Sequence, residues 1–291
     1  MGGWLVTGAG GMLGRELVAI LQGEDEKVIG LARSDLDITN AAAVWEAICG
    51  WRPAAVVNCA AWTAVDDAET HEDQAMAVNG HGAAHVAAAC RAAGARLIHL
   101  STDYVFGSST LPGGNGQRPW AEGDPPAPRS AYGRTKLAGE RAVLRELPQA
   151  GYVVRTAWLY GAHGPNFVRT MLRRARCGQP VDVVADQHGQ PTWACDVAQQ
   201  IVTVARKGAA PGIYHATSTG GTTWFGLAQE VYRLAGAGPR LVRPVTSGQY
   251  RRPAPRPSWS VLGHAAWHAA GLPPLPPWRH SLRRSFTTLT P

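Results

Sequence analysis

Short apolar runs alternate with amphipathic stretches through the first half of the chain. The apolar runs predict strands that are buried on both faces, at residues 4–7, 27–31, 54–58, 96–100 and 152–155. The stretches between them have helical spacing or a high alanine content and predict helices, at residues 12–22, 41–48, 73–93 and 132–147. Repeated strand–helix units of this kind predict an α/β fold, a Rossmann-like doubly wound parallel sheet.

The regular alternation ends near residue 159, and Pro and Gly interrupt the pattern beyond it. We therefore expect a dinucleotide-binding domain over residues 1–160, to which residues of about 192–215 return. Residues 161–291 are expected to form a smaller C-terminal lobe that binds the substrate. The stretch 107–130 is rich in Pro and Gly and longer than an ordinary connection, so we expect a lid over the site.

The composition is that of a globular protein. Of 291 residues, 45% are hydrophobic and 17% charged, which excludes a disordered chain or a coiled coil. No apolar run approaches the roughly 18 residues of a membrane span, so we expect a cytoplasmic protein without a membrane partner. The net charge of +7 is spread along the chain, which argues against a nucleic-acid partner. Cysteines without CxxC spacing and histidines without an HExxH pattern predict no metal site.

A glycine-rich turn follows the first predicted strand. Gly8, Gly11 and Gly14 have GxxGxxG spacing between that strand and the first helix. Glycines at this place let the backbone approach a pyrophosphate, which the helix N-terminus attracts. We therefore predict a nicotinamide dinucleotide as the cofactor. Arg33, after the second strand, suits a 2′-phosphate and favours NADPH, with NADH as the alternative.

Two further motifs carry the chemistry of a carbonyl reduction. Tyr132 and Lys136 are four residues apart at the start of a predicted helix, so the phenol and the ammonium share one face. The lysine charge is expected to lower the pKa of Tyr132 toward neutrality, which makes the phenol a proton donor to a carbonyl oxygen. Thr102 lies at the carboxyl end of the fourth strand, where ligands of open α/β sheets bind, and can hydrogen-bond the same carbonyl.

Six further stretches extend this pattern: Asn58 to Glu69, Ser101 to Phe106, Arg155 to Gly161, Asn166 to Val168, Asp186 to Thr192 and Arg256 to Leu262. With the glycine turn and the Tyr132–Lys136 pair, they resemble the dTDP-4-dehydrorhamnose reductase family. This family belongs to the extended short-chain dehydrogenase/reductase superfamily. The resemblance runs from about residue 4 to residue 262, and the Asn58 and Asp186 stretches are its most specific parts.

The resemblance implies reduction of the C4 ketone of a dTDP-4-keto-6-deoxyhexose, for rhamnose or for a natural-product sugar. It implies that Tyr132 is the general acid, that Lys136 binds the nicotinamide ribose and that Thr102 holds the carbonyl. The residues implied to line the cofactor are Gly8, Gly11, Met12, Leu13, Gly14, Arg33, Asp37, Ile38, Ala60, Ala61, Trp62, Thr63, Tyr132 and Lys136. Those implied to contact the sugar nucleotide are Thr102, Asp103, Trp158, Asn166 and Arg256. Some members of the family dimerise, so a homodimer is left open.

The chain departs from the family pattern at Cys59, Trp62, Gly107 and Trp120. We expect these departures to cluster at the entrance for the substrate, and they leave the particular sugar open.

Two other functions are weighed against reduction. A nucleotide-sugar dehydratase or epimerase would share the fold and the Tyr–Lys pair. The dehydratases carry a glutamate where this chain has Tyr104, so the acid and base for water elimination are incomplete. A non-catalytic, dinucleotide-binding regulatory subunit is the other alternative. The presence of Thr102, Tyr132 and Lys136 together argues for an enzyme.

Overall fold

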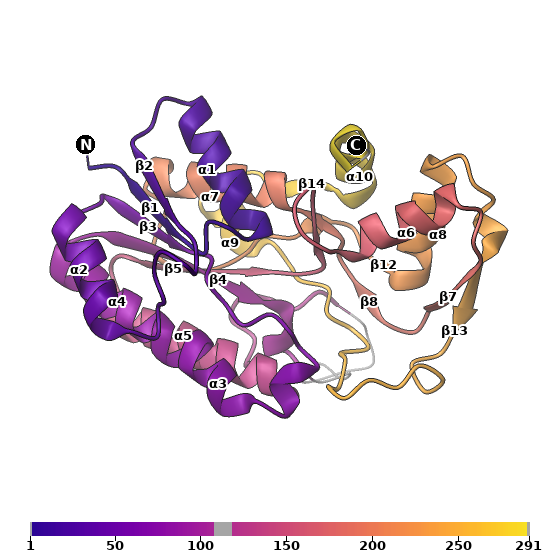
Figure 1. The fold of residues 1–291 in the computed structure, drawn as a ribbon, viewed down its shortest axis with the longest axis horizontal. Helices are drawn as coiled ribbons and strands as arrows, with labels where there is room; N and C mark the ends of the chain where they lie inside the picture. The colour runs from indigo at the N-terminus through magenta and orange to yellow at the C-terminus, as the bar shows by residue number, and fades with distance from the viewer. Residues whose placement is uncertain (1, 108–117, 290–291) are drawn as a thin grey trace.

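The computed structural model describes residues 2–107 and 118–289. Its centre is a six-stranded sheet in which all neighbouring strands are parallel. The strands follow the order β10-β5-β4-β3-β1-β2 across the sheet (Figure 1). Their bounds are β1 Trp4–Thr7, β2 Val28–Leu31, β3 Ala55–Asn58, β4 Arg96–Thr102, β5 Gly151–Thr156 and β10 Gly212–His215. This arrangement confirms the predicted doubly wound α/β fold.

Helices cover both faces of the sheet (Figure 1). One face carries α1 (Met12–Gly23) and α7 (Ala194–Lys207), and the other carries α2 (Ala41–Trp51), α4 (Ala83–Ala93) and α5 (Ala131–Glu146). Successive strand residues point to opposite faces, so Val57 is part of the core under α1 and α7 while Val56 is part of the core under α2 and α4. Both valines are fully buried. This burial explains why the strands have continuous apolar sequences.

The long helix predicted over residues 73–93 is broken. It consists of α3 (Glu72–Met76), a wider π-helical turn η2 (Ala77–Gly82) and then α4. Within the wide turn, Asn79 is 1% exposed and bonds the backbone of Trp62 and the hydroxyl of Thr135. Single π-helical turns within α-helices are rare and are frequently found at functional sites. The irregularity therefore ties the loop after β3 to α5.

A second lobe lies beside the carboxyl edge of the sheet. Its main elements are α6 (Phe167–Arg176), β7 (Val181–Val184), α8 (Trp224–Leu234), β13 (Val242–Val245) and α10 (Trp278–Leu289). They share a separate apolar core around Tyr160, Leu172 and Tyr232. The remaining elements are short: β6 Leu159–Tyr160, β8 His188–Gly189, β9 Thr192–Trp193, β11 Ser218–Thr219, β12 Thr222–Thr223, α9 Ala265–Ala269, β14 Leu275–Pro277, and the single turns η1 Asp67–Glu69, η3 Asp103–Val105 and η4 Pro239–Leu241.

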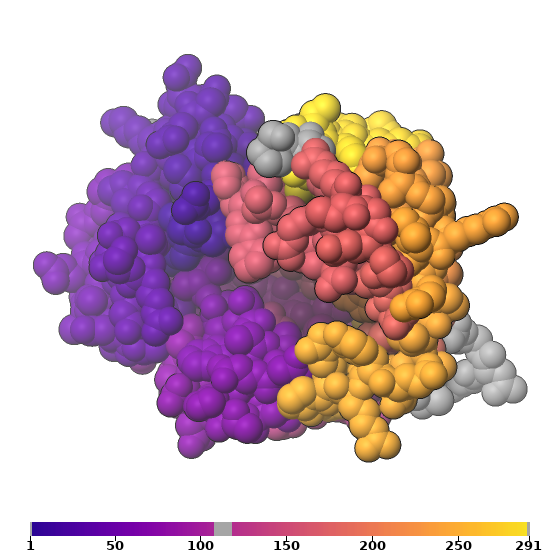
Figure 2. Space-filling model, turned by 45° about the vertical axis from the view of Figure 1, so that its right-hand side comes forward, coloured from indigo at the N-terminus to yellow at the C-terminus, as the bar shows by residue number. Residues whose placement is uncertain are grey.

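The chain passes between the two lobes more than once. After β9 it forms α7 on the face of the main sheet, and β10 then pairs with β5 at the edge of that sheet. Figure 2 shows a hollow between the residues of the first half of the chain and those of the second lobe. The division of the chain near residue 160 stays a prediction.

Part of the predicted lid, residues 108–117, lies outside the described residues. Beyond it, the backbone of Trp120 accepts a hydrogen bond from Gly263 and donates one to Val261, so this end of the stretch is fixed to a C-terminal segment. Within the two described ranges, no helix combines the length and apolar character that crossing a bilayer requires.

Candidate active site

The carboxyl ends of β1 and β3 lie side by side at the point where the strand order reverses. The sheet extends from β1 to β2 on one side and from β3 to β4, β5 and β10 on the other. Thr7 and Asn58 end these two strands in register, and Thr7 Oγ1 donates a 2.7 Å hydrogen bond to Asn58 Oδ1. Ligands of doubly wound folds bind in the crevice outside such a switch point.

The glycine turn occupies this switch point. Gly8 has a φ of +65°, and a Cβ there would lie 2.6 Å from the backbone nitrogen of Ala60. A Cβ at Gly14 would collide with the carbonyl oxygen of Gly8. Gly11 begins α1 without a side chain that bonds the first N–H groups of the helix. The turn therefore fits the pyrophosphate of a dinucleotide.

The residues that follow the turn contribute through their backbone. Leu13 is buried in the core under α1, so its side chain cannot reach a cofactor. Met12 is half-buried at the first helical position. Their N–H groups belong to the uncapped first turn of α1, which favours a negative charge.

The charged side chains after β2 differ in whether they form hydrogen bonds within the chain. Asp35 Oδ2 accepts a 2.8 Å hydrogen bond from the Ala32 N–H. Asp37 Oδ1 accepts from the N–H and the hydroxyl of Thr39, and these bonds lower the pKa of Asp37. Arg33 is exposed and, within the described part of the chain, makes no hydrogen bond or ion pair. Its charge also lowers the pKa of Asp37. This edge therefore presents an exposed cation, which suits the 2′-phosphate of NADP.

The loop after β3 forms the wall opposite Arg33. The N–H of Ala60 donates to Asn58 Oδ1 at 3.2 Å. Trp62 exchanges two hydrogen bonds with Asn79, from its N–H to Oδ1 at 2.9 Å and from Nδ2 to its carbonyl at 3.1 Å. The buried indole nitrogen of Trp62 has no hydrogen-bond partner among the described residues. The other residues predicted here differ in exposure: Ile38 is buried, Ala61 half-buried and Thr63 exposed.

The three residues predicted to be catalytic come together. Tyr132 and Lys136 belong to the first two turns of α5, and Thr102 ends β4. The Thr102 side chain lies close enough to the Tyr132 phenol to favour its ionised form, and its hydroxyl donates a 3.1 Å hydrogen bond to Asp103 Oδ1. Lys136 Nζ donates a 2.6 Å bond to the carbonyl oxygen of Leu100, two residues before Thr102. The Lys136 residue is 2% exposed and Tyr132 is 9% exposed.

The ionisation of the Tyr–Lys pair differs from the prediction. Burial raises the pKa of Tyr132 to about 12, although the hydrogen bond with Thr102 opposes this rise. Burial also lowers the pKa of Lys136 to about 8. The expected lowering of the Tyr132 pKa is therefore wrong, because desolvation of the phenolate dominates and the opposing effect comes from Thr102, not from Lys136. The phenol carries its proton at neutral pH, as a proton donor must.

Asp103 and Tyr104 follow Thr102 in the turn η3. Asp103 is 2% exposed, and burial raises its pKa to about 6, although the hydroxyls of Ser260 and Thr102 oppose the rise. The Tyr104 ring lies edge-on to Tyr132, with ring centroids 5.7 Å apart. The position that carries a glutamate in dehydratases therefore holds an aromatic ring packed against the phenol.

Trp158 is held in an unusual backbone conformation. Its φ is +46°, a left-handed value that is strained for a bulky residue. Its indole stacks on Trp224 with ring centroids 3.6 Å apart and planes 9° apart. A Cβ at Gly189 would lie 2.5 Å from the same indole. Trp224 was not predicted, since nothing in the sequence links two tryptophans so far apart.

Asn166 serves the helix that it begins. Its Oδ1 accepts a 3.0 Å hydrogen bond from the Arg169 N–H, and its Nδ2 donates to the carbonyls of Gly161 and Gly164. The amide thus bonds the first turn of α6 and the loop that precedes it. The structure gives Asn166 a capping role, and its contact with the substrate stays a prediction.

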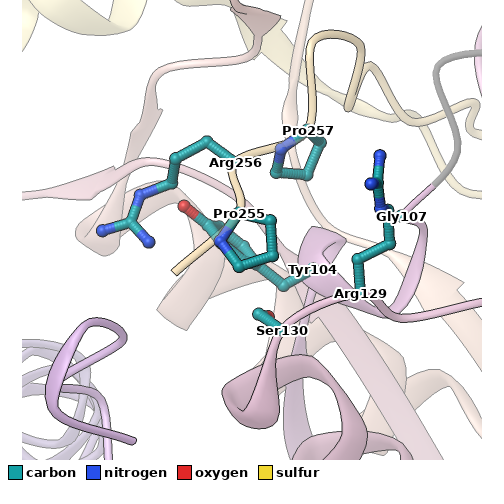
Figure 3. Close-up of a pocket in the computed structure, with 7 residues that line it drawn as sticks. All are labelled: Tyr104, Gly107, Arg129, Ser130, Pro255, Arg256 and Pro257. Carbon is teal, nitrogen blue, oxygen red and sulfur yellow. The ribbon is translucent and has the colours of Figure 1, made fainter. Parts of the chain in front are cut away.

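Arg256 lies at a hollow next to Tyr104 (Figure 3). Its Nη2 is 2.9 Å from Asp66 Oδ1, and its Cζ is 5.7 Å from the centroid of the Tyr104 ring. The hollow is lined by Tyr104, Gly107, Arg129, Ser130, Pro255, Arg256 and Pro257. Asp66 and Arg129 were not predicted as site residues. The Asn58 to Glu69 stretch pointed to the region of Asp66, whereas Arg129 carries no motif.

The departures from the family pattern do not all lie at the entrance. Trp120 is 3% exposed and stacks on Phe106 with ring centroids 4.6 Å apart, so it belongs to the interior. Cys59 lies near Lys136, and burial raises the pKa of its thiol to about 12. Gly107 lines the hollow beside Arg256. Among the described residues, no three His, Cys, Asp or Glu side chains gather where they could hold a metal ion.

Comparison with known proteins places the chain in a family. Residues 3–290 match the family model of the RmlD substrate binding domain. The chain is 57% identical to the dTDP-4-dehydrorhamnose reductase of Streptomyces griseus, over 98% of this chain and 93% of that protein. It is 52% identical to the dTDP-4-keto-6-deoxy-D-glucose reductase of Streptomyces niveus, over 98% and 97% of the two chains.

A solved structure agrees with this placement. The dTDP-4-dehydrorhamnose reductase of Bacillus anthracis, in complex with NADP, has a TM-score of 0.91 and 36% identity to this chain, with 99% of each chain covered. The match therefore includes both lobes and the glycine turn. On this evidence, the chain belongs to the dTDP-4-dehydrorhamnose reductase family.

Proposed function

We propose that this protein reduces the C4 ketone of a dTDP-4-keto-6-deoxyhexose to an alcohol with NADPH, in the biosynthesis of a deoxysugar. The observation that carries the proposal is the meeting of Thr102, Tyr132 and Lys136 beside a glycine turn that fits a pyrophosphate. The relatives from S. griseus and S. niveus are named as reductases of dTDP-linked sugars of this kind.

The two hydroxyl groups act on one carbonyl oxygen. The Thr102 hydroxyl donates a 3.1 Å hydrogen bond to Asp103 Oδ1 and lies beside the Tyr132 phenol. A carbonyl oxygen that contacts both hydroxyls receives the phenol proton and, when the Thr102 O–H turns from Asp103, a second donor as negative charge develops on it. A bound nicotinamide cofactor supplies the hydride to C4. Tyr132 then gives its proton to the oxygen, and Lys136 and Thr102 stabilise the phenolate that remains. Lys136 also has donors left to hold the ribose of the cofactor.

The cofactor is assigned to the crevice at the switch point. Gly8 and Gly14 leave room for the pyrophosphate, and the uncapped N-terminus of α1 supplies N–H donors. Arg33 supports NADPH over NADH, because both neighbouring carboxylates accept hydrogen bonds from backbone N–H groups and Arg33 is exposed. The relative from B. anthracis was solved with NADP.

The sugar nucleotide is assigned to the side of Asp103, Trp158 and Arg256. Trp158 is fixed by its stack on Trp224, and Arg256 offers a guanidinium next to Tyr104. A guanidinium suits a diphosphate because it presents planar, paired donors. We also propose that the chain divides into two domains near residue 160 and that it can form a homodimer.

The rival functions lack support from the site. Water elimination needs a carboxylate where Tyr104 packs against Tyr132. A regulatory subunit would not require a buried, hydrogen-bonded set of Thr102, Tyr132 and Lys136.

The variant Tyr132→Phe tests the proposed proton donor. We expect turnover with a dTDP-4-keto-6-deoxyhexose to fall about 100-fold or more, the usual contribution of a placed general acid, while NADPH binding persists. Turnover is measured from NADPH absorbance and binding from NADPH fluorescence. Tyr152→Phe is a matched control, since Tyr152 lies at the end of β5 far from the site. Its hydroxyl donates a hydrogen bond to the Ala209 carbonyl. Full activity of Tyr132→Phe would overturn the assignment.

A further inference from the structure

A buried ion pair lies behind the catalytic lysine. Glu140 belongs to α5 and Arg155 to β5, and their side chains are 1% and 2% exposed. Arg155 Nε donates to Glu140 Oε1 at 2.9 Å, and Nη2 donates to Oε2 at 2.7 Å. A buried pair of this kind adds little to net stability compared with apolar residues. Its presence therefore calls for an explanation other than stability.

The same carboxylate holds the end of β4. Ser101 Oγ donates a 2.5 Å hydrogen bond to Glu140 Oε1. Ser101 is the residue before Thr102, which supplies one of the two hydroxyls at the reacting carbonyl. Lys136 fixes the same strand through the Leu100 carbonyl. Successive residues of β4 are thus fastened to successive turns of α5.

Glu140 also faces Lys136. Tyr132, Lys136 and Glu140 are spaced four residues apart and share one face of α5. The attraction of Glu140 raises the pKa of Lys136 against the desolvation that lowers it. Burial keeps the neighbouring Cys59 thiol and His99 imidazole uncharged, because it raises the pKa of the thiol to about 12 and lowers that of the imidazole well below its usual range.

We propose that Glu140 is a positioning residue for the reduction: its carboxylate holds the Thr102 end of β4 against α5 and places a negative charge on the face of α5 that carries Lys136. The proposal rests on the proposed function, since Lys136 matters only if Tyr132 gives up a proton beside it. A purely structural ion pair would explain the Arg155 contacts. It would not require the bond to Ser101 or the shared face with Lys136.

The composition offers a direct test. The chain has three lysines, Lys27, Lys136 and Lys207, and the first and last are exposed. Carbon-13 NMR of the full chain with labelled lysine therefore gives one buried signal and two exposed references. We expect the buried signal to titrate near pH 8 in the natural protein. In Glu140→Gln it should titrate lower by about one pH unit or more, the effect of losing a close opposite charge.

Two further variants make the test decisive. Glu72→Gln is the matched control, because Glu72 forms a similar two-bonded pair with Arg134 of α5 but has no contact with Lys136. The Lys136 titration should not move in it. Glu140→Gln/Arg155→Gln removes both charges, so no buried cation is left unpaired if the single variant fails to fold. The downward shift should persist in it.

An unchanged Lys136 titration in a folded Glu140→Gln protein would overturn the proposal. A shift confined to the single variant would do the same, since it would arise from an unpaired Arg155. The titration needs no substrate, so its result is separate from whether the chain reduces a dTDP-sugar. For the Ser101 contact, Ser101→Ala should lower kcat several-fold with the Lys136 titration unmoved. An unaltered kcat would refute the positioning of Thr102.

Discussion

Burial sets the ionisation of the individual residues in this site. Desolvation favours the protonated forms of Tyr132 and Asp103 and raises their pKa values to about 12 and about 6. Desolvation also drives Lys136 toward its neutral form. The side chain of Thr102 opposes both rises. At neutral pH Tyr132 therefore keeps its proton, whereas Asp103 is mostly ionised.

Asp103 makes stability depend on pH. Its folded pKa of about 6 lies above the ordinary 3.8, so its contribution to stability is full below pH 4 and is lost as pH rises through 6. Asp103→Asn removes this loss and should be more stable than the natural protein by about 3 kcal/mol at pH 7.5. The gain should be absent at pH 4. Urea unfolding at the two pH values measures it, with exposed Asp73→Asn as control. A pH-independent difference would contradict this account.

The sequence could bring together the residues proposed to be catalytic because each stands in a motif with fixed spacing. Tyr132 and Lys136 are one helical turn apart, and Thr102 ends a strand. Local geometry therefore predicts which helix face and which sheet edge these side chains occupy. Asn166 shows a limit of this reasoning. Its place in a motif did not reveal that its amide caps α6 and bonds the loop before that helix. Contacts made over long sequence separations, such as Trp158 with Trp224, leave no pattern to read.

At the scale of elements, α5 carries the proposed proton donor Tyr132, and side chains on two sides hydrogen-bond its first turn. Ser130 Oγ accepts a 3.1 Å hydrogen bond from the Gly133 N–H. Glu69 Oε1 accepts from the Ala131 N–H at 2.8 Å. These two residues satisfy N–H groups that the helix itself leaves free. The position of Tyr132, in this first turn, therefore depends on the cap.

Ser130→Ala should act on both stability and activity. Loss of a helix cap costs about 1 kcal/mol of unfolding free energy. We expect kcat to fall as well, since Tyr132 is two residues from the cap. Asn40→Ala is the matched control, because Asn40 caps α2 through the Ala43 N–H at the same 3.1 Å. It should lose similar stability in urea unfolding and keep its kcat. Equal kcat in the two variants would argue against this role of the cap.

Elements with regular periodicity were predictable, and their interruptions were not. Strands β1, β3 and β5 are buried along their whole length, so their apolar runs were unambiguous. The predicted helix 73–93 instead contains the wide turn η2, since Asn79 must reach Trp62 and Thr135. In the second lobe, several strands have only two residues, too few for any alternation to show.

At the scale of the whole molecule, a few polar contacts join the lobes near the active site. Asp66, after β3, pairs with Arg256 and also accepts a 3.2 Å hydrogen bond from the Ala254 N–H. The segment after β13 is thereby held over Tyr104, which packs against Tyr132. The pair is partly exposed, so it adds little to stability. Its effect is expected on the geometry of the site.

Asp66→Asn tests this connection. We expect KM for the sugar nucleotide to rise several-fold, because the carboxylate that holds Arg256 and its backbone is lost. The Kd for NADPH should change little, since the glycine turn lies elsewhere at the switch point. Steady-state kinetics and NADPH fluorescence give the two values, with Asp182→Asn, which loses the exposed pair with Arg243, as control. A rise in the Kd for NADPH with an unchanged KM for the sugar nucleotide would refute this role of Asp66.

We infer above all that this chain transfers a hydride from NADPH to a dTDP-4-keto-6-deoxyhexose. This is tested most directly by incubating the natural protein with NADPH, or separately NADH, and enzymatically generated dTDP-4-keto-L-rhamnose, and by identifying the product. We expect rapid oxidation of NADPH, slower oxidation of NADH and a 4-hydroxy sugar nucleotide as product. NADPH that binds but is not oxidised by this or any other dTDP-4-keto-6-deoxyhexose would contradict it.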